Sequence, residues 1–501
     1  MTKLPTLDVL TSTGSGKDVD VVGVFQDPTG KKASALKGPY GKVLEKFKKT
    51  QVFSGSPGSV QFIRFGGRGS AESVVLVGLG KPAELTDEKL RSFGGNVWAK
   101  LKAEKVRTCA VHLDSLMSAE SSLRTARAFA EGLVLSCYEF NHHKTKAPNA
   151  DDYSGPSKIG FLTSDKNLRA ALKGELVYVS AALEAMNVTR DWSNEPSNIG
   201  TPEYYAEESK KLAKKYGITC KILTESDALK EKMGLFIGVG QGAEREGRIV
   251  VLDYNPKGAQ KTICFVGKGV TFDSGGISIK PSLRMEDMKH DMTGAATIMG
   301  ATLLAAKMKV PNRIITIMAF TENMPSGNAI QPGNILKARN GKTVEIINTD
   351  AEGRLILADI LDYAQDFKPD AVVNAATLTG AISVALGKQC CGIFGNDEIL
   401  IDQIRRIGDA SGERIWQLPL FDEYFDDMKS DYADMKNSCN DSNGGAIRGA
   451  IFLKQYIRKG TRWAHLDIAA TANGLTQYSY LPKRGANGTY VRTLAQFAAE
   501  F

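Results

Sequence analysis

The chain contains 501 residues with a mass of 54.1 kDa, which is longer than one hydrophobic core usually serves and indicates two or three domains. Its 42% hydrophobic and 24% charged residues exclude disordered and fibrous classes, and seven cysteines without a CxxC pair argue against a disulfide framework. The net charge of +8 lies wholly in the first 175 residues, which hold 26 basic and 18 acidic residues, and this asymmetry points to separate domains.

In the first third of the chain, short β-branched runs alternate with stretches of helical periodicity. Strands are predicted at residues 19–25, 73–79, 108–113 and 159–163, and helices at residues 42–49 and 123–137. We therefore predict an N-terminal α/β domain over residues 1–174.

Two observations bear on location. Residues 1–16 lack the apolar core of a secretory signal, and the longest apolar stretch, residues 372–387, is too short and too polar to span a bilayer. Scattered cysteines in odd number fit a reducing compartment. The sequence therefore predicts a cytoplasmic protein without a membrane partner.

The predicted connection between domains covers residues 175–198, with a helix at 175–190 followed by a polar, turn-rich segment. Thr201-Pro202 then opens a helix that ends near Gly217, because threonine caps helices and proline is favoured at their first position.

The remaining chain, residues 199–501, is predicted to form a second domain in which strands and helices alternate. Strands are predicted at 248–254, 261–267, 313–320, 344–348, 371–376, 391–395 and 465–469, with helices at 293–308 and 355–367. Several of these strands are apolar on both faces, which is typical of a mostly parallel sheet flanked by helices. The predicted fold class is therefore α/β with two domains.

Three polar segments follow predicted strands of this second domain. Residues 266–280 place Lys268, Asp273 and Lys280 among four glycines, and Asp291 precedes a long helix. Residues 348–355 run from a strand into a helix. Because ligands of open α/β sheets bind at the carboxyl ends of strands, these segments can converge on one crevice.

The third segment adds Asp350, Glu352 and Arg354, so that the crevice would hold four carboxylates. Four such groups repel one another unless cations are present, and they suffice for two divalent ions that share a bridging ligand. An extended backbone would point Asp350 and Glu352 the same way. Lys280 and Arg354 remain as cations that could stabilise an oxyanion or hold an anion.

Structural explanations compete with this interpretation. Asp291 could simply cap the helix that follows it, and Asp350 and Glu352 could favour a helix N-terminus through its dipole. The three segments together are harder to explain in this way than each is alone.

The segment Asn348-Thr-Asp-Ala-Glu-Gly-Arg-Leu355 is identical to the signature of the leucyl aminopeptidase family of metallopeptidases. The segments at 267–280, 291–296 and 190–196 resemble the same family in order and spacing. The resemblance extends from Asn187 to the C-terminus and covers the first third only loosely. It implies a macro-like N-terminal α/β domain, a catalytic C-terminal domain, a cytoplasmic homohexamer and a role in peptide catabolism.

The resemblance also implies roles for individual residues. Lys268, Asp273, Asp291 and Glu352 resemble ligands of one metal ion, and Asp273, Asp350 and Glu352, with the Asp350 carbonyl, resemble those of a second, exchangeable ion. Lys280 resembles the catalytic lysine and Arg354 the arginine that holds bicarbonate. The residues that resemble the lining of the side-chain pocket are Met288, Asn348, Thr377, Gly380 and Ala469.

The implied ligands indicate which metals are suitable. Only the neutral amine of Lys268 can coordinate a cation, and a nearby dication favours loss of its proton. A mixed nitrogen and oxygen site suits zinc, whereas the all-oxygen site also admits manganese or magnesium.

We expect an aminopeptidase that releases leucine and other neutral residues from peptides with a free N-terminus. Two alternatives remain open. The same carboxylates could serve a two-metal phosphohydrolase, and the basic first third could bind DNA weakly through a helical face that carries Lys42, Lys46 and Lys49.

Overall fold

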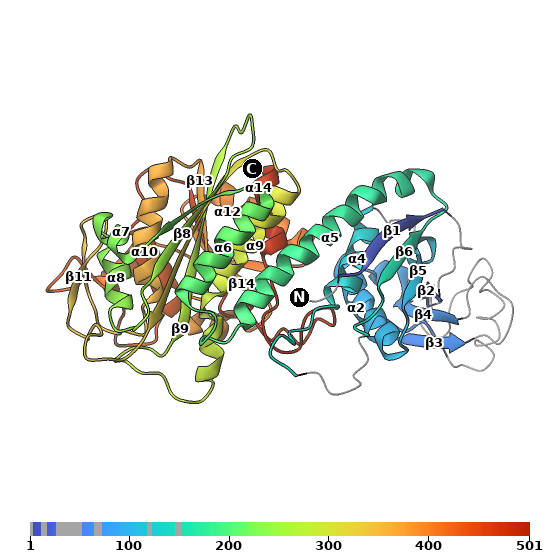
Figure 1. The fold of residues 1–501 in the computed structure, drawn as a ribbon, viewed down its shortest axis with the longest axis horizontal. Coiled ribbons are helices and arrows are strands. Elements are labelled where there is room, and N and C mark those ends of the chain that lie inside the picture. Colours follow the sequence, from blue (N-terminus) through green and yellow to red (C-terminus); the bar gives the residue numbers. More distant parts are fainter. Residues whose placement is uncertain (1–3, 12–17, 27–52, 65–72, 118–122, 146–152) are drawn as a thin grey trace. The chain divides into compact units, whose positions relative to one another are not determined.

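The structure is a computed structural model that describes residues 4–11, 18–26, 53–64, 73–117, 123–145 and 153–501. The chain forms two compact units, of which the first comprises Met1–Glu184 with Leu475–Lys483 and the second Ala185–Gly474 with Arg484–Phe501. Helix α5 (Lys166–Asn194) runs through the division between them (Figure 1). None of the described helices is both long and apolar enough to cross a membrane.

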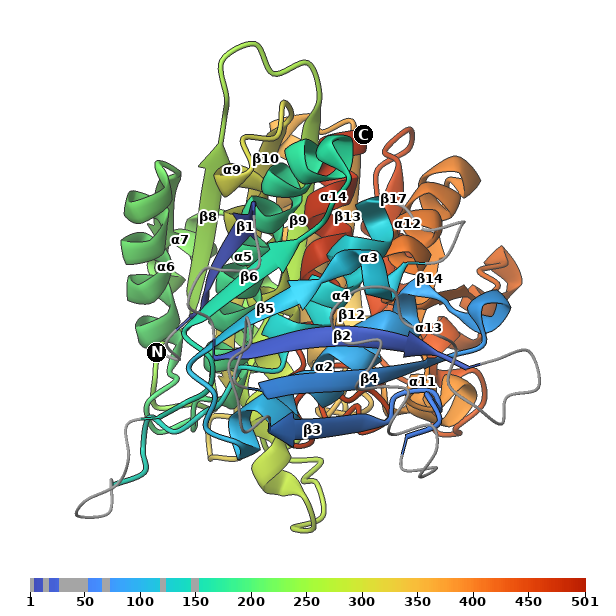
Figure 2. The same ribbon diagram turned by 90° about the vertical axis from the view of Figure 1, so that its right-hand side faces the viewer.

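The first unit contains a six-stranded sheet with helices packed on it. Its strands, in spatial order, are β1 (Thr6–Leu10), β6 (Lys158–Leu162), β5 (Thr108–His112), β2 (Val19–Phe25), β4 (Ser73–Gly80) and β3 (Val60–Arg64) (Figure 2). Neighbouring strands are parallel except at β3, which is antiparallel to β4. Among the described residues of this unit, the α-helices besides α5 are α2 (Asp87–Ala103), α3 (Leu113–Leu116) and α4 (Leu123–Leu135).

Helices α2 and α4 approach each other closely because glycines lie at their crossing. A Cβ atom at Gly132 would overlap the backbone of Arg91, and one at Gly94 would lie 2.6 Å from the Leu133 nitrogen. A buried ion pair between Arg91 and Glu131, at 2.8 Å, joins the two helices at the same place. The crossing therefore leaves no room for a larger side chain.

The second unit contains an eight-stranded sheet. Its strands, in spatial order, are β15 (Ile415–Gln417), β14 (Cys391–Gly395), β17 (Trp463–Asp467), β13 (Ala371–Ala376), β9 (Thr262–Asp273), β10 (Arg313–Asn323), β8 (Arg248–Tyr254) and β7 (Thr219–Leu223). The four central strands, β17, β13, β9 and β10, are parallel to one another, and antiparallel strands flank them. This confirms the predicted α/β class with a mostly parallel sheet.

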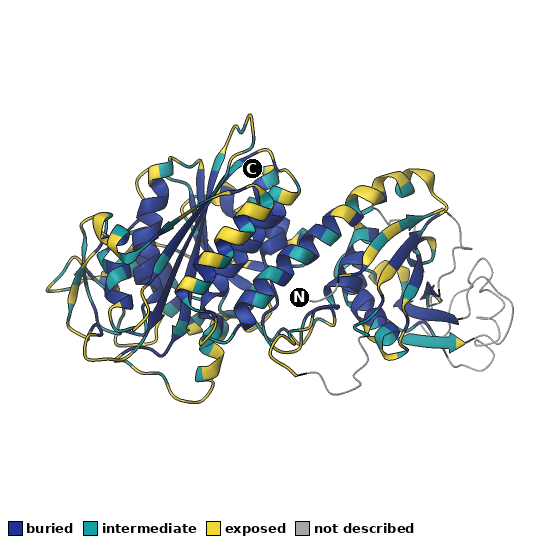
Figure 3. Cartoon of the chain, viewed as in Figure 1, coloured by how far each residue is buried: buried dark blue, intermediate teal, exposed yellow. Residues whose placement is uncertain are grey.

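Helices cover this sheet on both sides, and its strands are buried along most of their length (Figures 1 and 3). Helix α9 (Thr293–Lys307) contacts β9, β13 and α14 (Val491–Glu500), whereas α10 (Gly353–Ala364) contacts β9, β10 and α8 (Gly234–Gly240). The remaining α-helices of this unit are α6 (Pro202–Tyr216), α7 (Glu225–Lys230), α11 (Gly380–Leu386), α12 (Glu398–Ser411) and α13 (Gly445–Lys454). A small sheet consists of β11 (Ile335–Lys337), β12 (Thr343–Glu345) and β16 (Met435–Lys436).

The structure differs from the sequence-based prediction in several places. Helix α5 continues to Asn194, so the predicted turn-rich segment at 191–198 is helical in its first half. The strand predicted at 344–348 is only β12, which lies in the small sheet. Helix α6 is as predicted, since the Thr201 hydroxyl accepts a bond from the Tyr204 nitrogen and Gly217 ends the helix with φ 68°. The predicted helix at 42–49, with its lysine face, lies outside the described residues.

Two glycine substitutions, one at the crossing of α2 and α4 and one outside it, are expected to change the stability of the protein in opposite directions. Gly132→Ala is expected to lower the free energy of unfolding by about 1–3 kcal/mol, because the new methyl group overlaps the Arg91 backbone. Gly174→Ala, in helix α5, is expected to raise it by about 0.5–1 kcal/mol, because a Cβ there meets no atom within 4 Å. Thermal and denaturant unfolding of the two variants measure this contrast, and equal effects would contradict it.

Candidate functional site

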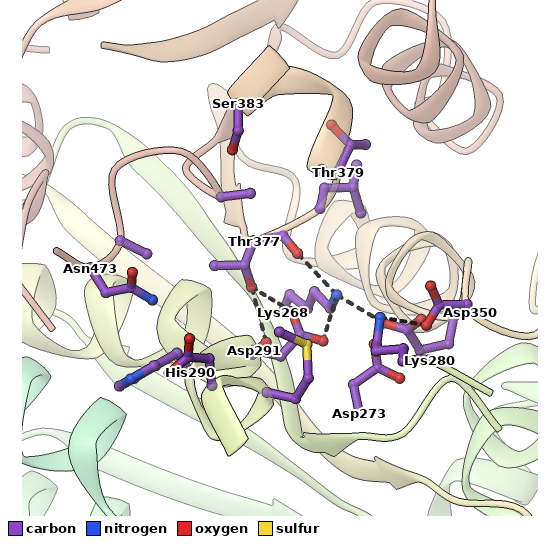
Figure 4. A pocket seen from close by; sticks show the side chains of 17 residues that line it. Lys268, Asp273, Lys280, His290, Asp291, Asp350, Thr377, Thr379, Ser383 and Asn473 are labelled. Atoms are coloured by element: carbon purple, nitrogen blue, oxygen red, sulfur yellow. Dashed lines mark hydrogen bonds and ion pairs between the residues drawn. The ribbon is translucent and has the colours of Figure 1, made fainter. Parts of the chain in front are cut away.

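A cavity of about 310 Å³ lies where the parallel strands of the second unit end (Figure 4). Ten of the twelve residues predicted for the site line it: Lys268, Asp273, Lys280, Met288, Asp291, Asp350, Glu352, Thr377, Gly380 and Ala469. The other two, Asn348 and Arg354, lie behind the lining. The structure therefore brings the three predicted segments together with residues of the chain near Thr377 and Ala469.

A β-bulge in strand β9 explains why two of these residues share a face. Lys268 and Asp273 are five positions apart, and side chains at odd separations normally point to opposite faces of a strand. The register of β9 with β10 shifts by one residue next to Thr271, so that Val270 and Phe272 oppose the consecutive residues Thr321 and Glu322. The extra residue restores the common face, and both side chains reach the cavity.

The remaining carboxylates lie at the starts of helices. Asp291 is in the 3₁₀ helix η2 (Met285–Met292), directly before α9, and Glu352 directly precedes α10. Neither acts as a cap, because α9 and α10 have no side-chain N-cap bond. The expectation that an extended backbone aligns Asp350 and Glu352 is wrong, since Glu352 has helical angles of φ −77° and ψ −36°.

Two lysines are interleaved with the four carboxylates. The Lys268 ammonium lies 2.8 Å from both Asp291 Oδ2 and Glu352 Oε1 and donates a bond of 3.0 Å to the Thr377 carbonyl. Lys268 is only 3% exposed. Burial lowers its pKa, but the surrounding carboxylates outweigh this effect and hold the pKa above its usual value.

The second lysine is less deeply buried than Lys268. The Lys280 ammonium is 2.8 Å from Asp273 Oδ2 and also forms an ion pair with Asp350. Figure 4 shows both lysines pointing into the carboxylate cluster from opposite sides. Burial lowers the pKa of Lys280, but the charges of Asp273 and Glu352 raise it by a larger amount. Lys280 is therefore a cation at neutral pH.

The carboxylates carry more negative charge than their surroundings offset. Burial raises the pKa of Glu352 to about 8, with a further contribution from the charge of Asp273. Burial likewise raises the pKa of Asp291 to about 6 and moves that of Asp350 upward. These shifts mean that additional positive charge would be stabilised among these side chains.

The donor set fits divalent metal ions. Carboxylate oxygens of Asp273, Asp350 and Glu352 all lie within 4.8 Å of one another. Both Glu352 oxygens, Asp291 Oδ2 and Asp350 Oδ1 are buried and accept no hydrogen bond from the described part of the chain, although lysine ammonium groups lie near three of them. Unsatisfied carboxylate oxygens grouped in this way are the ligands that hard divalent cations prefer.

Asn323, at the end of β10, was not predicted from the sequence and fixes one of the carboxylates. Its Nδ2 donates bonds of 2.8 Å to Asp273 Oδ1 and 3.0 Å to the Thr349 carbonyl. The Gly275 nitrogen donates a second bond, of 2.9 Å, to the same Asp273 oxygen. Asn323 therefore ties the end of β9 to the segment that carries Asp350.

Asn437 is a second residue that the sequence did not reveal. Its Oδ1 accepts a bond from the Ile347 nitrogen at 2.8 Å, and its Nδ2 donates to the Asn348 carbonyl at 2.7 Å. Its own carbonyl accepts a bond of 2.8 Å from Arg354 Nη1. The fully buried Asn437 thus holds the loop before α10 through its side-chain amide and Arg354 through its backbone carbonyl.

The two predicted residues that do not line the cavity support it from behind. Asn348 Oδ1 accepts a bond of 2.8 Å from the Asp350 nitrogen. Arg354 is buried, and its Nε has no hydrogen-bond partner among the described residues. Burial lowers the pKa of Arg354, while the charges of Glu352 and Asp467 act in the opposite direction.

The wall of the cavity away from the carboxylates is largely uncharged. Met288, Thr377, Gly380 and Ala469 were predicted here, and the structure adds Asp287, His290, Leu378, Thr379, Ser383, Ala472 and Asn473. Most of the added residues are sequence neighbours of predicted ones, and this closeness in the sequence could have identified them as lining residues. Figure 4 shows Asn473 and Ser383 on the side of the cavity away from Asp273 and Asp350.

Two family models match the chain in tandem. The model of the cytosol aminopeptidase family, N-terminal domain, matches residues 21–147, and that of the catalytic domain of the same family matches residues 187–495. The second match includes every residue of the carboxylate cluster.

Individual relatives extend over nearly the whole chain. A protein of Geobacter sp. strain M21 named "Probable cytosol aminopeptidase" is 40% identical over 478 residues, which cover 95% of this chain and 96% of that protein. One of the same name from Rickettsia felis is 41% identical over 438 residues, or 86% of each chain.

Solved structures agree with these matches. The bottromycin maturation enzyme BotP superimposes with a TM-score of 0.84 at 31% identity, over 97% of this chain and 99% of its own, and a second structure of BotP, in complex with Mn, matches equally well. From the two family models and these relatives it follows that the chain belongs to the cytosol aminopeptidase family, to which its carboxylate segments already pointed.

Proposed function

We propose that the chain is a two-metal aminopeptidase that releases leucine and other neutral residues from peptides with a free N-terminus. The observation that carries this proposal is the composition of one cavity, in which a cluster of mostly buried carboxylates and lysines lies next to a largely uncharged wall. The cluster suits a substrate's amine and scissile carbonyl, and the wall suits a neutral side chain. Membership of the cytosol aminopeptidase family supports the same reaction.

The family resemblance supplies the assignment of metal ligands, and the grouping of Asp273, Asp350 and Glu352 in the cavity supports it. Lys268, Asp273, Asp291 and Glu352 would hold one ion, while Asp273, Asp350 and Glu352, with the Asp350 carbonyl, would hold the other. Zinc suits the site with a nitrogen ligand, and manganese or magnesium suits the all-oxygen site. Bound divalent cations polarise a carbonyl oxygen and make a water molecule nucleophilic at neutral pH.

The chain itself supplies the groups that act on the substrate's other atoms. Lys280 is a cation at the edge of the carboxylate cluster, where it can donate a hydrogen bond to the oxygen that becomes negative during attack. Arg354 has an Nε atom without a partner among the described residues, and we propose that it holds bicarbonate as a proton shuttle. Met288, Thr377, Gly380 and Ala469 would contact the N-terminal side chain.

The proposal also concerns the assembly and its place in the cell. The family resemblance supports a homohexamer in the cytoplasm that acts in peptide catabolism. Weak DNA binding by the basic first third stays a prediction from the sequence, because its lysines at positions 42, 46 and 49 lie outside the described residues.

The reaction itself is tested with matched peptides. A leucine-initiated peptide is expected to release free leucine when Zn²⁺ or Mn²⁺ is present, whereas its N-acetylated counterpart is not, because it offers no amine. A chelator should stop release, and added metal should restore it. Peptides that begin with aspartate or glutamate should be cleaved more slowly, and faster cleavage of them would contradict the neutral pocket.

The metal ligands are tested by Asp350→Ala and Glu352→Ala. Each variant is expected to lose peptide hydrolysis together with bound metal, because each removes carboxylate oxygens from the cluster. Metal analysis of the purified proteins, alongside activity, measures both effects. Glu286→Ala is the control, since this carboxylate is exposed and does not line the cavity. Full activity in either ligand variant would reject the two-metal site.

Lys280→Ala is expected to behave differently from the ligand variants. It should keep its metal and lose turnover by about 10²-fold, which is the scale of losing one oxyanion donor. Lys268→Ala is the comparison and should lose metal. If Lys280→Ala lost metal in proportion to activity, Lys280 would have a structural and not a catalytic role.

A further inference from the structure

Asp467, the last residue of β17, is a fully buried carboxylate that does not line the cavity. Four donors converge on it. Its Oδ1 accepts bonds from the backbone nitrogens of Leu378, Thr379 and Ala469 at 3.1, 3.4 and 3.3 Å, and its Oδ2 accepts a 2.6 Å bond from the Thr379 hydroxyl.

These donors belong to two separate walls of the cavity. One wall follows β13 and includes Thr377, Leu378 and Thr379, while the other follows β17 and includes Ala469. Strands β13 and β17 are parallel neighbours in which Ala376 lies opposite Asp467. Because both walls begin at these strand ends, one carboxylate between them can set the distance that separates the walls.

The first wall also reaches the carboxylate cluster. Thr377, directly before Leu378, accepts a 3.0 Å bond from Lys268 at its carbonyl. Its hydroxyl donates a 2.8 Å bond to Asp291 Oδ1. A shift of the wall would therefore move the substrate pocket relative to two of the proposed metal ligands.

A buried carboxylate is costly to keep in a protein interior unless strong hydrogen bonds compensate for its lost hydration. Burial raises the pKa of Asp467 to about 6, even though the four donors lower it. A neutral side chain would avoid this cost but could not accept bonds from three N–H groups and a hydroxyl together. The carboxylate of Asp467 is therefore suited to hold several backbone segments at the same time.

We propose that Asp467 is the positioning residue that sets the width of the pocket for the N-terminal side chain, by holding the Thr377–Thr379 wall and the Ala469 wall together. This inference rests on the proposed aminopeptidase function and extends it to specificity. A wider pocket still admits small side chains but fits a leucine side chain less closely.

The test compares kcat/KM for leucine and alanine substrates of the same scaffold in wild-type protein and in Asp467→Ala. The value for leucine is expected to fall by about 10²-fold, as misplacement of a binding wall does. The leucine-to-alanine ratio should fall by about tenfold, because the contact with additional methylene groups is weakened. Asp467→Asn should restore most of the ratio, since its amide keeps an oxygen for the N–H groups and can donate to the Thr379 hydroxyl.

Asp359→Ala is the matched control. Asp359 is also fully buried and accepts three backbone bonds, from Leu235 and Phe236 at 2.9 Å and from Arg339 at 2.8 Å, but it does not line the cavity or touch its walls. Its loss should lower the unfolding temperature and leave the leucine-to-alanine ratio unchanged. Loss of stability alone would therefore not produce the result expected for Asp467→Ala.

The leucine-to-alanine ratio distinguishes a positioning role of Asp467 from a purely structural one. If Asp467→Ala does not fold, Thr379→Val decides, because it removes the 2.6 Å bond with little change in size and should lower the ratio in the same direction. An unchanged ratio in the folded variant overturns the positioning role while wild-type activity still supports the aminopeptidase. Wild-type protein that releases no leucine overturns both.

Discussion

Mutual repulsion among four carboxylates, three of them buried and Asp350 half-buried, is the constraint around which the second unit is arranged. Asp273, Asp291, Asp350 and Glu352 come from three segments, and no single segment could place them together. The parallel strands bring these segments to one edge of the sheet, and the bulge in β9 turns Asp273 to the same face as Lys268. Two lysine ammonium groups offset part of this negative charge, while burial and the charge of Asp273 raise the pKa of Glu352.

Besides the two lysines, two neutral residues fix the positions of the carboxylate segments. Asn323 fixes Asp273 and Asn437 fixes the loop before α10, and both do so through neutral amides. Further carboxylates in these places would have increased the repulsion within the cluster. Asp467, by contrast, is a charged residue that holds the pocket walls and not the carboxylates, and its charge and that of Glu352 both act on buried Arg354. Distance from the cluster and proximity to an arginine make a carboxylate acceptable there.

The sequence predicted the fold class and the carboxylate cluster because both depend on local patterns. Strand and helix periodicity is visible within ten to twenty residues, and the site segments at 266–280 and 348–355 are contiguous. Asn323, Asn437 and Asp467 could not be found in this way, because each is an isolated polar residue whose role arises only when distant backbone groups converge on it. The incorrect expectation for Asp350 and Glu352 has a related cause. Spacing of two residues indicates a shared face only in a strand, and the backbone at Glu352 has already become helical.

The segment that follows the pocket wall links the two units in a way that the order of the sequence conceals. After Asn473 and Gly474 the chain enters residues 475–483, which pack as part of the first unit, where Ser479 Oγ donates a 2.5 Å bond to the Ser92 carbonyl. Gly95 permits this packing, because a Cβ there would lie 2.7 Å from the Tyr480 nitrogen. The chain then returns, and Asn487 bonds back to the Ala472 carbonyl at 3.0 Å, directly behind the cavity. The chain therefore passes between the two units three times, once within α5, once before Leu475 and once after Lys483. Separating the units at the predicted boundary alone would expose Tyr480 and Leu481, which are buried in the intact chain.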